Sequence, residues 1–417
     1  MISFIHLSDI HFRRCSGDSY DNDDDLRNEM LIDIRECFGL DCMNPQGILV
    51  CGDVAFSGQQ KEYEIANDFL AKICGAIGIE KNAVYCVPGN HDVDQNIPKN
   101  EVAVKLLQEY LENVRDQNEF DYRLASIMRG EHSATALMLP ISKYQEEFAA
   151  RYDCYMEPKE LGWEHEININ EEYNIRLFGL NSVLISNADD HKPERTTERL
   201  MHLGRCQMPK RKQNTILLTL CHHPTECWDD QTNELKSLLD NRATIQFYGH
   251  KHDLKLASSQ TSLYISSGAV HPSRYEPGWI PTYNWISLEI QRQHGQDYLE
   301  VRILPRVYSQ EKSCFVDNTS IANEQRRYLL PLGGVNARSA TPEAGIDAEV
   351  VCKPEWSKQF AYDFMNLPPI QRDEILRELG LDRTEDKDRR HYEYLREIVQ
   401  RAEQMGCENE LLRRIKS

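Results

Sequence analysis

Three common features are missing from this sequence, and each absence argues against a class of protein. No apolar run is long enough to cross a bilayer and no secretory leader is present, so we expect a cytoplasmic protein with no membrane partner. The 13 cysteines include no C-x-x-C pair, which argues against a thiolate metal site and favours reduced thiols. Basic residues are scarce, because 48 Lys and Arg face 67 Asp and Glu and leave a net charge of −19. A chain this acidic is a poor general binder of nucleic acid, although its net charge does not exclude a local basic groove.

What the sequence does contain is a polar turn directly after an apolar strand. Residues Ala83–Val87 predict a buried strand, and Pro88-Gly89 ends it sharply before an amide, an imidazole and a carboxylate. An ordinary polar turn would explain this stretch if it stood alone. The same arrangement, however, follows four other predicted strands: Phe4–Leu7, Gly47–Cys51, Thr215–Cys221 and Ala243–Tyr248.

Each of these five strands ends in residue types that bind metal ions. In chain order the strands are followed by Asp9 and His11, by Asp53, by Asn90, by His222 and His223, and by His250 and His252. The Asp-x-His and His-x-His pairs have alternate spacing, so in an extended chain both side chains can share one side. Carboxylate, amide and imidazole ligands suit Mn²⁺, Fe or Zn²⁺. The carboxyl ends of strands in an open α/β sheet are where such a site is expected.

The five blocks, taken in order, resemble the motifs of the calcineurin-like metallophosphoesterase family: Asp-x-His, Gly-Asp, Gly-Asn-His-Asp, His and Gly-His-x-His. The resemblance covers about residues 2–305. It implies a two-sheet sandwich flanked by helices that holds two divalent metal ions. Mn²⁺ is the preferred assignment, with Fe or Zn²⁺ as alternatives. The resemblance also implies that one ion is bound by Asp9, His11, Asp53 and His252, and the other by Asp53, Asn90, His222 and His250. Asp53 is then the ligand that both ions share.

The resemblance gives roles to residues that are not ligands. His91 is expected to face the leaving oxygen and to donate a proton or stabilise charge there, and Asp92 is expected to hydrogen-bond His91 and orient it. Four further residues are candidates for substrate contacts, and each has a plain structural alternative. Arg13 and Arg14 suit a substrate phosphate, although a solvated loop fits slightly better; His223 fits a position behind the ligands, and His271 fits a satisfied structural histidine.

The order of predicted elements indicates an α/β fold. The strand, helix, strand spacing between Gly47 and Val87 predicts parallel pairing, and Trp285–Ile290 with Tyr298–Ile303 predicts a closing antiparallel hairpin. We therefore expect a metallophosphoesterase domain over residues 1–309. Inside it, residues 97–160 predict helices that form either a cap beside the metal site or a peripheral scaffold.

Beyond this domain the pattern changes twice. Residues 310–355 have the small, polar composition of a linker, whereas residues 356–417 have helical apolar spacing and no set of ligands or nucleophiles. The latter region, with Leu367-Pro368-Pro369 and Leu379-Gly380-Leu381, resembles the effector-associated, death-like adaptor domains that couple bacterial enzymes to partner proteins. The alternative for this small all-α module is a helical tail packed on the enzyme core.

The whole sequence therefore predicts a two-metal phosphoesterase, in the first place a phosphodiesterase acting on a nucleotide or nucleic-acid phosphodiester. Its C-terminal module is expected to bind a protein partner, and resemblance alone suggests an effector enzyme of a bacterial defence system. The alternative is a non-catalytic phosphoesterase scaffold that serves protein interaction, and the complete ligand set argues against it. The sequence leaves the oligomeric state open.

Overall fold

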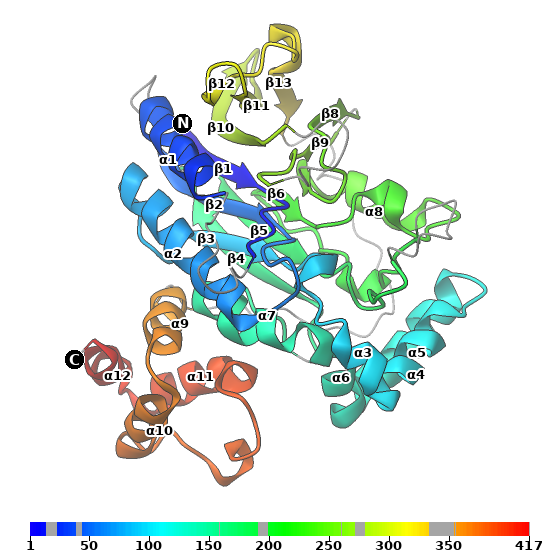
Figure 1. Cartoon of the computed structure of the whole chain (residues 1–417), viewed down its shortest axis with the longest axis vertical. Coiled ribbons are helices and arrows are strands. Elements are labelled where there is room, and N and C mark those ends of the chain that lie inside the picture. Colours follow the sequence, from blue (N-terminus) through cyan, green and yellow to red (C-terminus); the bar gives the residue numbers. More distant parts are fainter. Residues whose placement is uncertain are drawn as a thin grey trace.

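Two mixed β-sheets form the centre of the molecule (Figure 1). The computed structural model describes residues 1–13, 23–38, 44–157, 159–190, 199–259, 261–271, 280–332, 354 and 356–416. In the first sheet the order is β12 (Cys314–Asp317), β11 (Gln296–Ser309), β10 (Thr282–Gln293), β1 (Ile2–Leu7), β2 (Pro45–Cys51) and β3 (Val84–Val87), and β13 (Arg327–Pro331) also pairs with β11. In the second sheet the order is β4 (Gly162–Asn168), β5 (Asn174–Leu180), β6 (Thr215–Leu220), β7 (Ile245–Tyr248), β9 (Leu263–Ser266) and β8 (Lys255–Ser258).

Parallel pairing in the middle of each sheet determines where the polar turns lie. β1, β2 and β3 run parallel to one another, as do β5, β6, β7 and β9. β1 and β3 are buried along their whole length, as apolar strands covered on both faces should be. Because the carboxyl ends of parallel strands share one edge of a sheet, the turns that follow β1, β2 and β3 meet there. The turn after β7 joins them, since the amide of His250 donates to Asp9.

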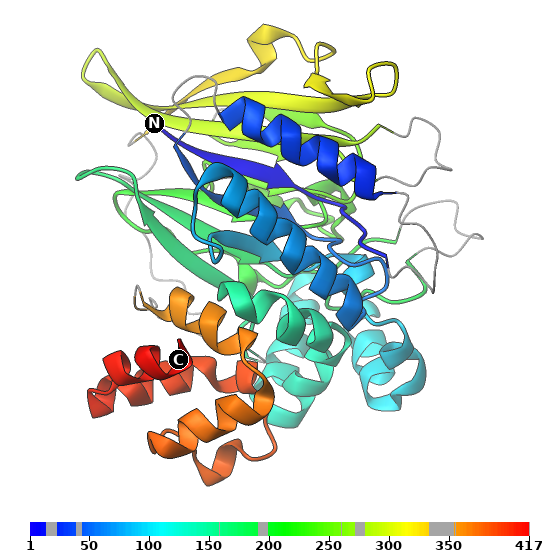
Figure 2. The same ribbon diagram turned by 60° about the vertical axis from the view of Figure 1, so that its left-hand side comes forward.

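Helices cover the outer faces of both sheets. α1 (Asp24–Phe38) and α2 (Gln60–Ile77) lie side by side along the first sheet (Figure 2). α8 (Glu234–Asp240) packs Leu235 and Leu239 into a cluster with Phe178 and Leu217 of the second sheet. The predicted two-sheet sandwich flanked by helices is therefore confirmed.

The region 97–160 is helical, as predicted. It begins with α3 (Asn96–Asn100) and continues with α4 (Val102–Glu112), α5 (Gln117–Arg129), α6 (Glu131–Met138) and α7 (Ser142–Glu147). Gln108 of α4 donates to the carbonyls of Leu184 and Ser186 at 3.2 and 3.1 Å, and Asp121 of α5 pairs with Arg205. These contacts attach the helices to the long loop that follows β5.

The predicted linker over residues 310–355 is wrong in its first half. β12 and β13 lie in this range and both pair with β11, so the first sheet continues past the predicted hairpin. Phe315 and Leu330 are buried in the main core. Each of these short strands has one buried side chain, so their sequences show little of the alternation of apolar and polar residues that predicts a strand. Their strand conformation depends on pairing with β11. Residues 333–353 and 355 lie outside the described residues.

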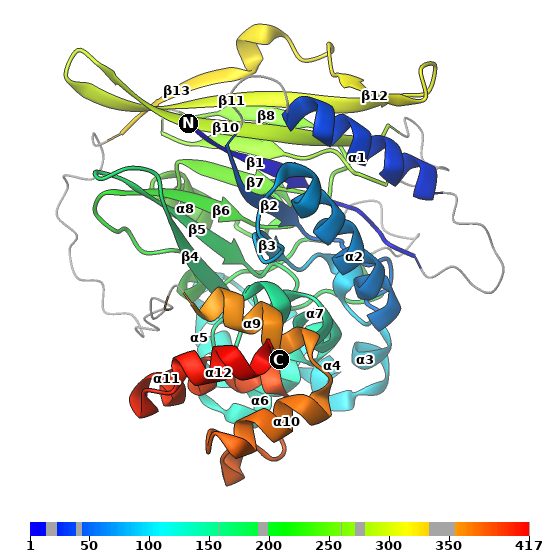
Figure 3. The same ribbon diagram turned by 90° about the vertical axis from the view of Figure 1, so that its left-hand side faces the viewer.

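The C-terminal region forms an all-helical module that rests on the core (Figure 3). It consists of α9 (Ser357–Asn366), α10 (Pro369–Glu378), α11 (Leu395–Met405) and α12 (Glu408–Ile415), joined by turns. Lys358 Nζ in α9 donates to the carbonyls of Val84 at 3.1 Å and Tyr152 at 2.6 Å. Arg396 forms a two-pronged ion pair with Glu160. The module is thus docked against the edge of β3. Its position is that of a helical tail packed on the enzyme core, the alternative given above.

Two further observations concern the whole described chain. None of its helices combines the length and the apolar character that crossing a bilayer requires. Every cysteine that the structure describes is a free thiol.

Candidate metal centre

The seven expected ligands come together at the carboxyl ends of five strands. Asp9 and His11 follow β1, Asp53 follows β2, Asn90 follows β3, His222 follows β6, and His250 and His252 follow β7. All of them are buried except the last two, which are partly exposed. Strands far apart in the sequence therefore deliver one cluster of oxygen and nitrogen donors.

The Asp53 carboxylate lies between two groups of these donors. Its Oδ2 atom is 3.1 Å from His11 Nε2 and 3.4 Å from His222 Nε2. His11 and His222 belong to different ions in the assignment that the family resemblance implies. One carboxylate oxygen is therefore within reach of both proposed metal positions.

The remaining ligands sort to the two sides of Asp53. On one side, His252 Nε2 is 3.4 Å from Asp9 Oδ1. On the other side, Asn90 Oδ1 is 2.9 Å from His222 Nε2 and 3.1 Å from His250 Nδ1. The seven side chains thus lie close together, and their division between two ions stays a prediction from the family resemblance.

Backbone strain is concentrated at these ligands. Five of them have the positive φ that non-glycine residues rarely adopt, between 51° and 71°: Asp9, His11, Asp53, His250 and His252. Each such residue stores roughly 1–3 kcal/mol of strain and persists only where its surroundings enforce the conformation. The surrounding sheets supply that enforcement, since the amide of Asp9 donates to the Gly52 carbonyl at 3.2 Å. Contacts between the turns therefore help to hold the ligands in these conformations.

Two motif glycines allow the strand-end turns to approach one another. A Cβ atom on Gly89 would lie 2.1 Å from Asp53 Oδ1, and one on Gly249 would lie 1.9 Å from Ser8 Oγ. Both distances are far below van der Waals contact. The glycines in Gly-Asn-His-Asp and Gly-His-x-His are thus required by close packing around the ligands.

Outer hydrogen bonds orient the ligand side chains. His222 Nδ1 donates to the Cys51 carbonyl at 2.8 Å, which leaves Nε2 as the atom that faces Asp53. Ser8 Oγ donates to Asp9 Oδ2 at 2.5 Å. Sequence reasoning missed Ser8, and its only signal was its place beside Asp9, which any turn serine would share.

The titratable side chains of the cluster shift one another's pKa values. Burial would raise the pKa of the Asp9 carboxyl, but the neighbouring imidazole of His252 and the charge of His222 lower it to about 2. For Asp53 burial is again outweighed, and His222, His91 and His11 lower its pKa well below the usual range. Burial lowers the pKa of His222. Ionised carboxylates are the protonation state that metal binding requires.

His91 lies at the edge of the cluster. Its Nδ1 atom is 2.8 Å from the Phe56 carbonyl, and its ring lies 5.3 Å from the Phe56 ring and 4.7 Å from the His11 ring. Its amide donates to Asp53 Oδ1 at 2.8 Å. Burial favours neutral His91, but the Asp53 charge and the Phe56 carbonyl outweigh it and raise its pKa.

Asp92 does not orient His91 through the expected hydrogen bond. Its carboxylate is fully buried and accepts the amides of Val54, Ala55 and Gly89 at 3.2, 2.9 and 2.9 Å, together with the Tyr63 hydroxyl at 3.2 Å. Burial and the nearby Asp53 charge raise its pKa to about 7. Asp92 ties the turns after β2 and β3 together, and the Phe56 carbonyl takes the place that we expected Asp92 to fill.

The four candidates for substrate contacts lie in different surroundings. Arg13 is exposed, with its guanidinium carbon 3.9 Å from the centre of the Phe56 ring, whereas Arg14 lies outside the described residues. His223 is buried behind the ligands with Nδ1 2.8 Å from Ser182 Oγ, and its ring centre is 4.3 Å from that of His250. His271 Nδ1 is 2.5 Å from the Ile10 carbonyl and burial lowers its pKa to about 4, whereas its buried Nε2 atom has no hydrogen-bond partner among the described residues.

An open pocket of about 770 Å³ adjoins the ligands. Its walls are formed by His11, Asp53, Phe56, Ser57, Gln59, Asn90, His91, Val93, Gln95, Asn96, His250 and His252. Among the described residues, the lining includes none from 97–160. Whether this region serves as a cap or as a peripheral scaffold therefore stays a prediction.

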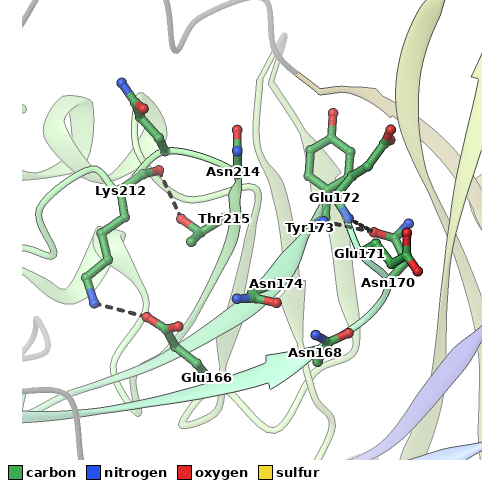
Figure 4. Close-up of a pocket in the computed structure, with 11 residues that line it drawn as sticks. Glu166, Asn168, Asn170, Glu171, Glu172, Tyr173, Asn174, Lys212, Asn214 and Thr215 are labelled. Atoms are coloured by element: carbon green, nitrogen blue, oxygen red, sulfur yellow. Dashed lines mark hydrogen bonds and ion pairs between the residues drawn. The ribbon is translucent and has the colours of Figure 1, made fainter.

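A second hollow, of about 450 Å³, lies at the opposite end of the second sheet (Figure 4). It is lined by Glu166 in β4, by residues of the β4–β5 turn such as Asn170, and by Lys212 and Thr215 just before and at the start of β6. β5 and β6 begin here, so this hollow is remote from the strand ends that carry the histidines.

The donors of the cluster fit divalent metal ions. Asp9 Oδ1 is buried and accepts no hydrogen bond within the described part of the chain. Such an atom loses about 1–3 kcal/mol of solvation unless a cation or donor meets it. The ligand atoms of Asp9, Asp53 and His222 lie within 4.8 Å of one another, and so do those of Asp9, His11 and His252. Mixed carboxylate, amide and imidazole donors are suited to Mn²⁺, Fe and Zn²⁺.

A two-sheet α/β sandwich with histidines and carboxylates at its strand ends defines the metallophosphoesterase class of folds. Residues 2–254 match the family model described as calcineurin-like phosphoesterase, and this chain belongs to that family. The C-terminal residues 358–417 match a second model, described as a GTPase-associated adaptor domain. The adaptor resemblance of the module is therefore confirmed.

Three proteins that are similar to this chain share little sequence identity with it. A protein of Bacillus subtilis (strain 168), described as an uncharacterized metallophosphoesterase-like protein YydB, is 22% identical over 306 residues, which cover 71% of this chain. The chain spans 58% of the length of that relative. A Vps29 double mutant from Entamoeba histolytica is 12% identical, with a TM-score of 0.29 and coverage of 76% of this chain and 98% of that one. A putative 5'-nucleotidase from Staphylococcus aureus is 11% identical, with a TM-score of 0.36 and coverage of 87% and 58%.

Proposed function

We propose that this chain is a two-metal phosphodiesterase that hydrolyses a nucleotide or nucleic-acid phosphodiester. The observation that carries this proposal is the position of Asp53, whose Oδ2 atom is 3.1 Å from one group of ligands and 3.4 Å from the other. A carboxylate shared in this way is what a binuclear site needs. Membership of the phosphoesterase family supports the type of reaction.

The proposed ligands are the seven residues at the strand ends. Asp53 is shared; Asp9, His11 and His252 complete one site, and Asn90, His222 and His250 complete the other. When bound, two divalent ions neutralise charge on the phosphoryl oxygens and supply a nucleophile at neutral pH. The strained backbone of the ligands holds their side chains ready, which limits reorganisation during the reaction.

We assign the proton transfer to His91. Its Nδ1 atom faces the Phe56 carbonyl, an acceptor only, so Nδ1 carries a proton and the ring is held in one orientation. Nε2 is then the atom that can deliver a proton to the leaving oxygen of a substrate in the pocket. Asp92 is reassigned from orienting His91 to anchoring the two turns.

We also propose that the C-terminal module recruits a protein partner. The family description of residues 358–417 favours a GTPase-bearing protein as that partner. The cytoplasmic location and the role in a bacterial defence system are part of the proposal and rest on the sequence resemblance alone. In this scheme the docked module positions the phosphodiesterase, and the catalytic residues all come from the larger domain.

Asp53→Asn tests the two-metal assignment. The variant should bind fewer than two Mn²⁺ ions by elemental analysis and should lose at least about 100-fold in turnover of bis-p-nitrophenyl phosphate, since both sites lose charge. Its melting temperature measured without metal should stay close to the parent value. Undiminished turnover with both ions retained would refute the proposal.

A further inference from the structure

α4 exposes a row of large apolar side chains on its outer face. Val102, Leu106 and Tyr110 recur at every fourth residue and are 70%, 58% and 43% exposed. The other face of the helix buries Val104 and Leu111, and α4 packs against α3, α5 and α6 (Figure 1). No other helix in the described part of the chain exposes three large apolar side chains. A helix with apolar residues on both faces is normally covered on both, so these three residues, which we call the α4 row, indicate a surface that another molecule covers.

The centre of the α4 row is open, whereas one end is partly covered. The guanidinium carbon of Arg123 lies 4.5 Å from the centre of the Tyr110 ring, and Arg123 also donates to the Tyr110 carbonyl. These contacts hold the ring in place and leave part of it exposed. Leu106 at the centre and Val102 at the other end keep more than half of their surface exposed. The surface available for binding is therefore centred on Leu106.

The spacing of the row suits another helix with the same row. Side chains four residues apart form the ridge that two helices most often use when they pack, with their axes crossing at about −50°. A second copy of this chain presents an identical ridge, so two copies can pair through a two-fold axis at Leu106. With the helices antiparallel, Val102 of one copy meets the partner's Tyr110, and the two Leu106 side chains meet at the axis.

Charges beside the row favour the antiparallel arrangement. Lys105 and Glu109 are exposed on one flank of the row, and their Nζ and Oε1 atoms form a loose ion pair of 3.9 Å. In an antiparallel pair each Lys105 lies beside the partner's Glu109, whereas in a parallel pair like charges meet. An anionic membrane surface is a poorer match, because Glu101 and Glu109 border the row and the chain has a net charge of −19.

We propose that the α4 row is a contact surface for a second copy of this chain, with antiparallel α4 helices and Leu106 at the two-fold axis. α3 begins with Asn96, which lines the metal pocket, and packs against α4. The contact therefore lies next to the pocket, and the dimer holds its two pockets on either side of one interface. A contact of three side chains per copy is at the small end of interfaces, so association in the micromolar range is expected. The inference does not depend on the proposed activity.

Exchange of the two charges tests this pairing. Lys105→Glu sets acidic side chains against each other across the interface, and Glu109→Lys sets basic ones against each other. Each variant alone should dimerise about tenfold more weakly than the wild type, measured by sedimentation velocity of the full-length protein between about 1 and about 200 µM. An equimolar mixture of the two variants should regain association, because every contact between unlike chains then joins opposite charges.

Two further variants locate the contact on the molecule. Leu106→Glu should raise the dissociation constant at least about 100-fold, since both copies lose a buried apolar side chain and gain a charge. Ile370→Ser removes an exposed apolar side chain of α10 in the C-terminal module and should leave dimerisation unchanged. The melting temperature and circular dichroism spectrum of each variant should match the wild type, because all the replaced side chains are exposed.

Several results would overturn the inference. A wild-type protein that stays monomeric over the whole concentration range has no such contact. A dimer that Leu106→Glu leaves intact, or that Ile370→Ser abolishes, forms through another surface. A mixture of the two charge variants that stays monomeric excludes the antiparallel pairing. If the monomeric protein binds vesicles of equal parts phosphatidylcholine and phosphatidylserine and Leu106→Glu abolishes that binding, a membrane covers the α4 row instead.

Discussion

Replacing Gly89 by alanine should disable the metal centre through a single methyl group. The added Cβ atom would lie 2.1 Å from Asp53 Oδ1 and 2.4 Å from the Asp53 amide nitrogen. Ordinary contacts begin near 3.4 Å, so the two turns must separate by more than 1 Å. The shared carboxylate is the group that moves, and a misplacement of about 1 Å at a reacting centre costs on the order of 100-fold in rate. Overpacking of this kind also destabilises a fold by about 1–3 kcal/mol.

Gly75→Ala is the matched control. Gly75 lies inside α2, and a Cβ atom there would have no neighbour within 4 Å. The substitution should stabilise the protein by roughly 0.5–1 kcal/mol, because alanine favours the helix. For each variant we would measure Mn²⁺ content, the turnover of bis-p-nitrophenyl phosphate, and the melting temperature. If Gly89→Ala kept both ions and its full turnover, the close approach of the two turns would have no role in the site.

Three further predictions concern His91, the docked module and its buried ion pair. His91→Ala should retain both ions, and its loss in rate should be greater for a diester with an alkoxide leaving group than for one that releases p-nitrophenolate; equal losses would exclude an acid role. Lys358→Ala should lower the free energy of unfolding, measured by urea titration, by about 1.5–3 kcal/mol, since it removes charged hydrogen bonds to two carbonyls. Lys387 is exposed, so Lys387→Ala should leave the free energy of unfolding nearly unchanged. Burial alone would raise the pKa of Asp386, but its pairing with Arg401 lowers it. This pair should therefore stabilise the fold above about pH 4 and lose that effect as the pH falls. Asp386→Asn should flatten the acid limb of a curve of unfolding free energy against pH, and an unaltered limb would contradict the assignment.

The sequence by itself determined the identity of the proposed ligands. Each lies one to four residues beyond an apolar strand, and a strand that ends in a polar turn is a local pattern that needs no partner to be recognised. The parallel pairing of β2 and β3 could be predicted for the same reason, because α2 connects them directly. The helical C-terminal module was equally accessible, since α9 to α12 have their own apolar spacing.

Only the tertiary structure decided the features that depend on residues distant in sequence. β12 and β13 are ordered through pairing with β11, so their residues looked like a linker. Asp92 could bond either to its neighbour His91 or to main-chain amides from another turn, and the convergence of β2 and β3 settled the choice. Lys358 contacts the edge of β3 only because the module folds back over some 270 residues of chain. The positive φ of Asp9 and Asp53 is likewise a property of the assembled sheets, because local preference opposes it and only tertiary packing can supply the energy that maintains it.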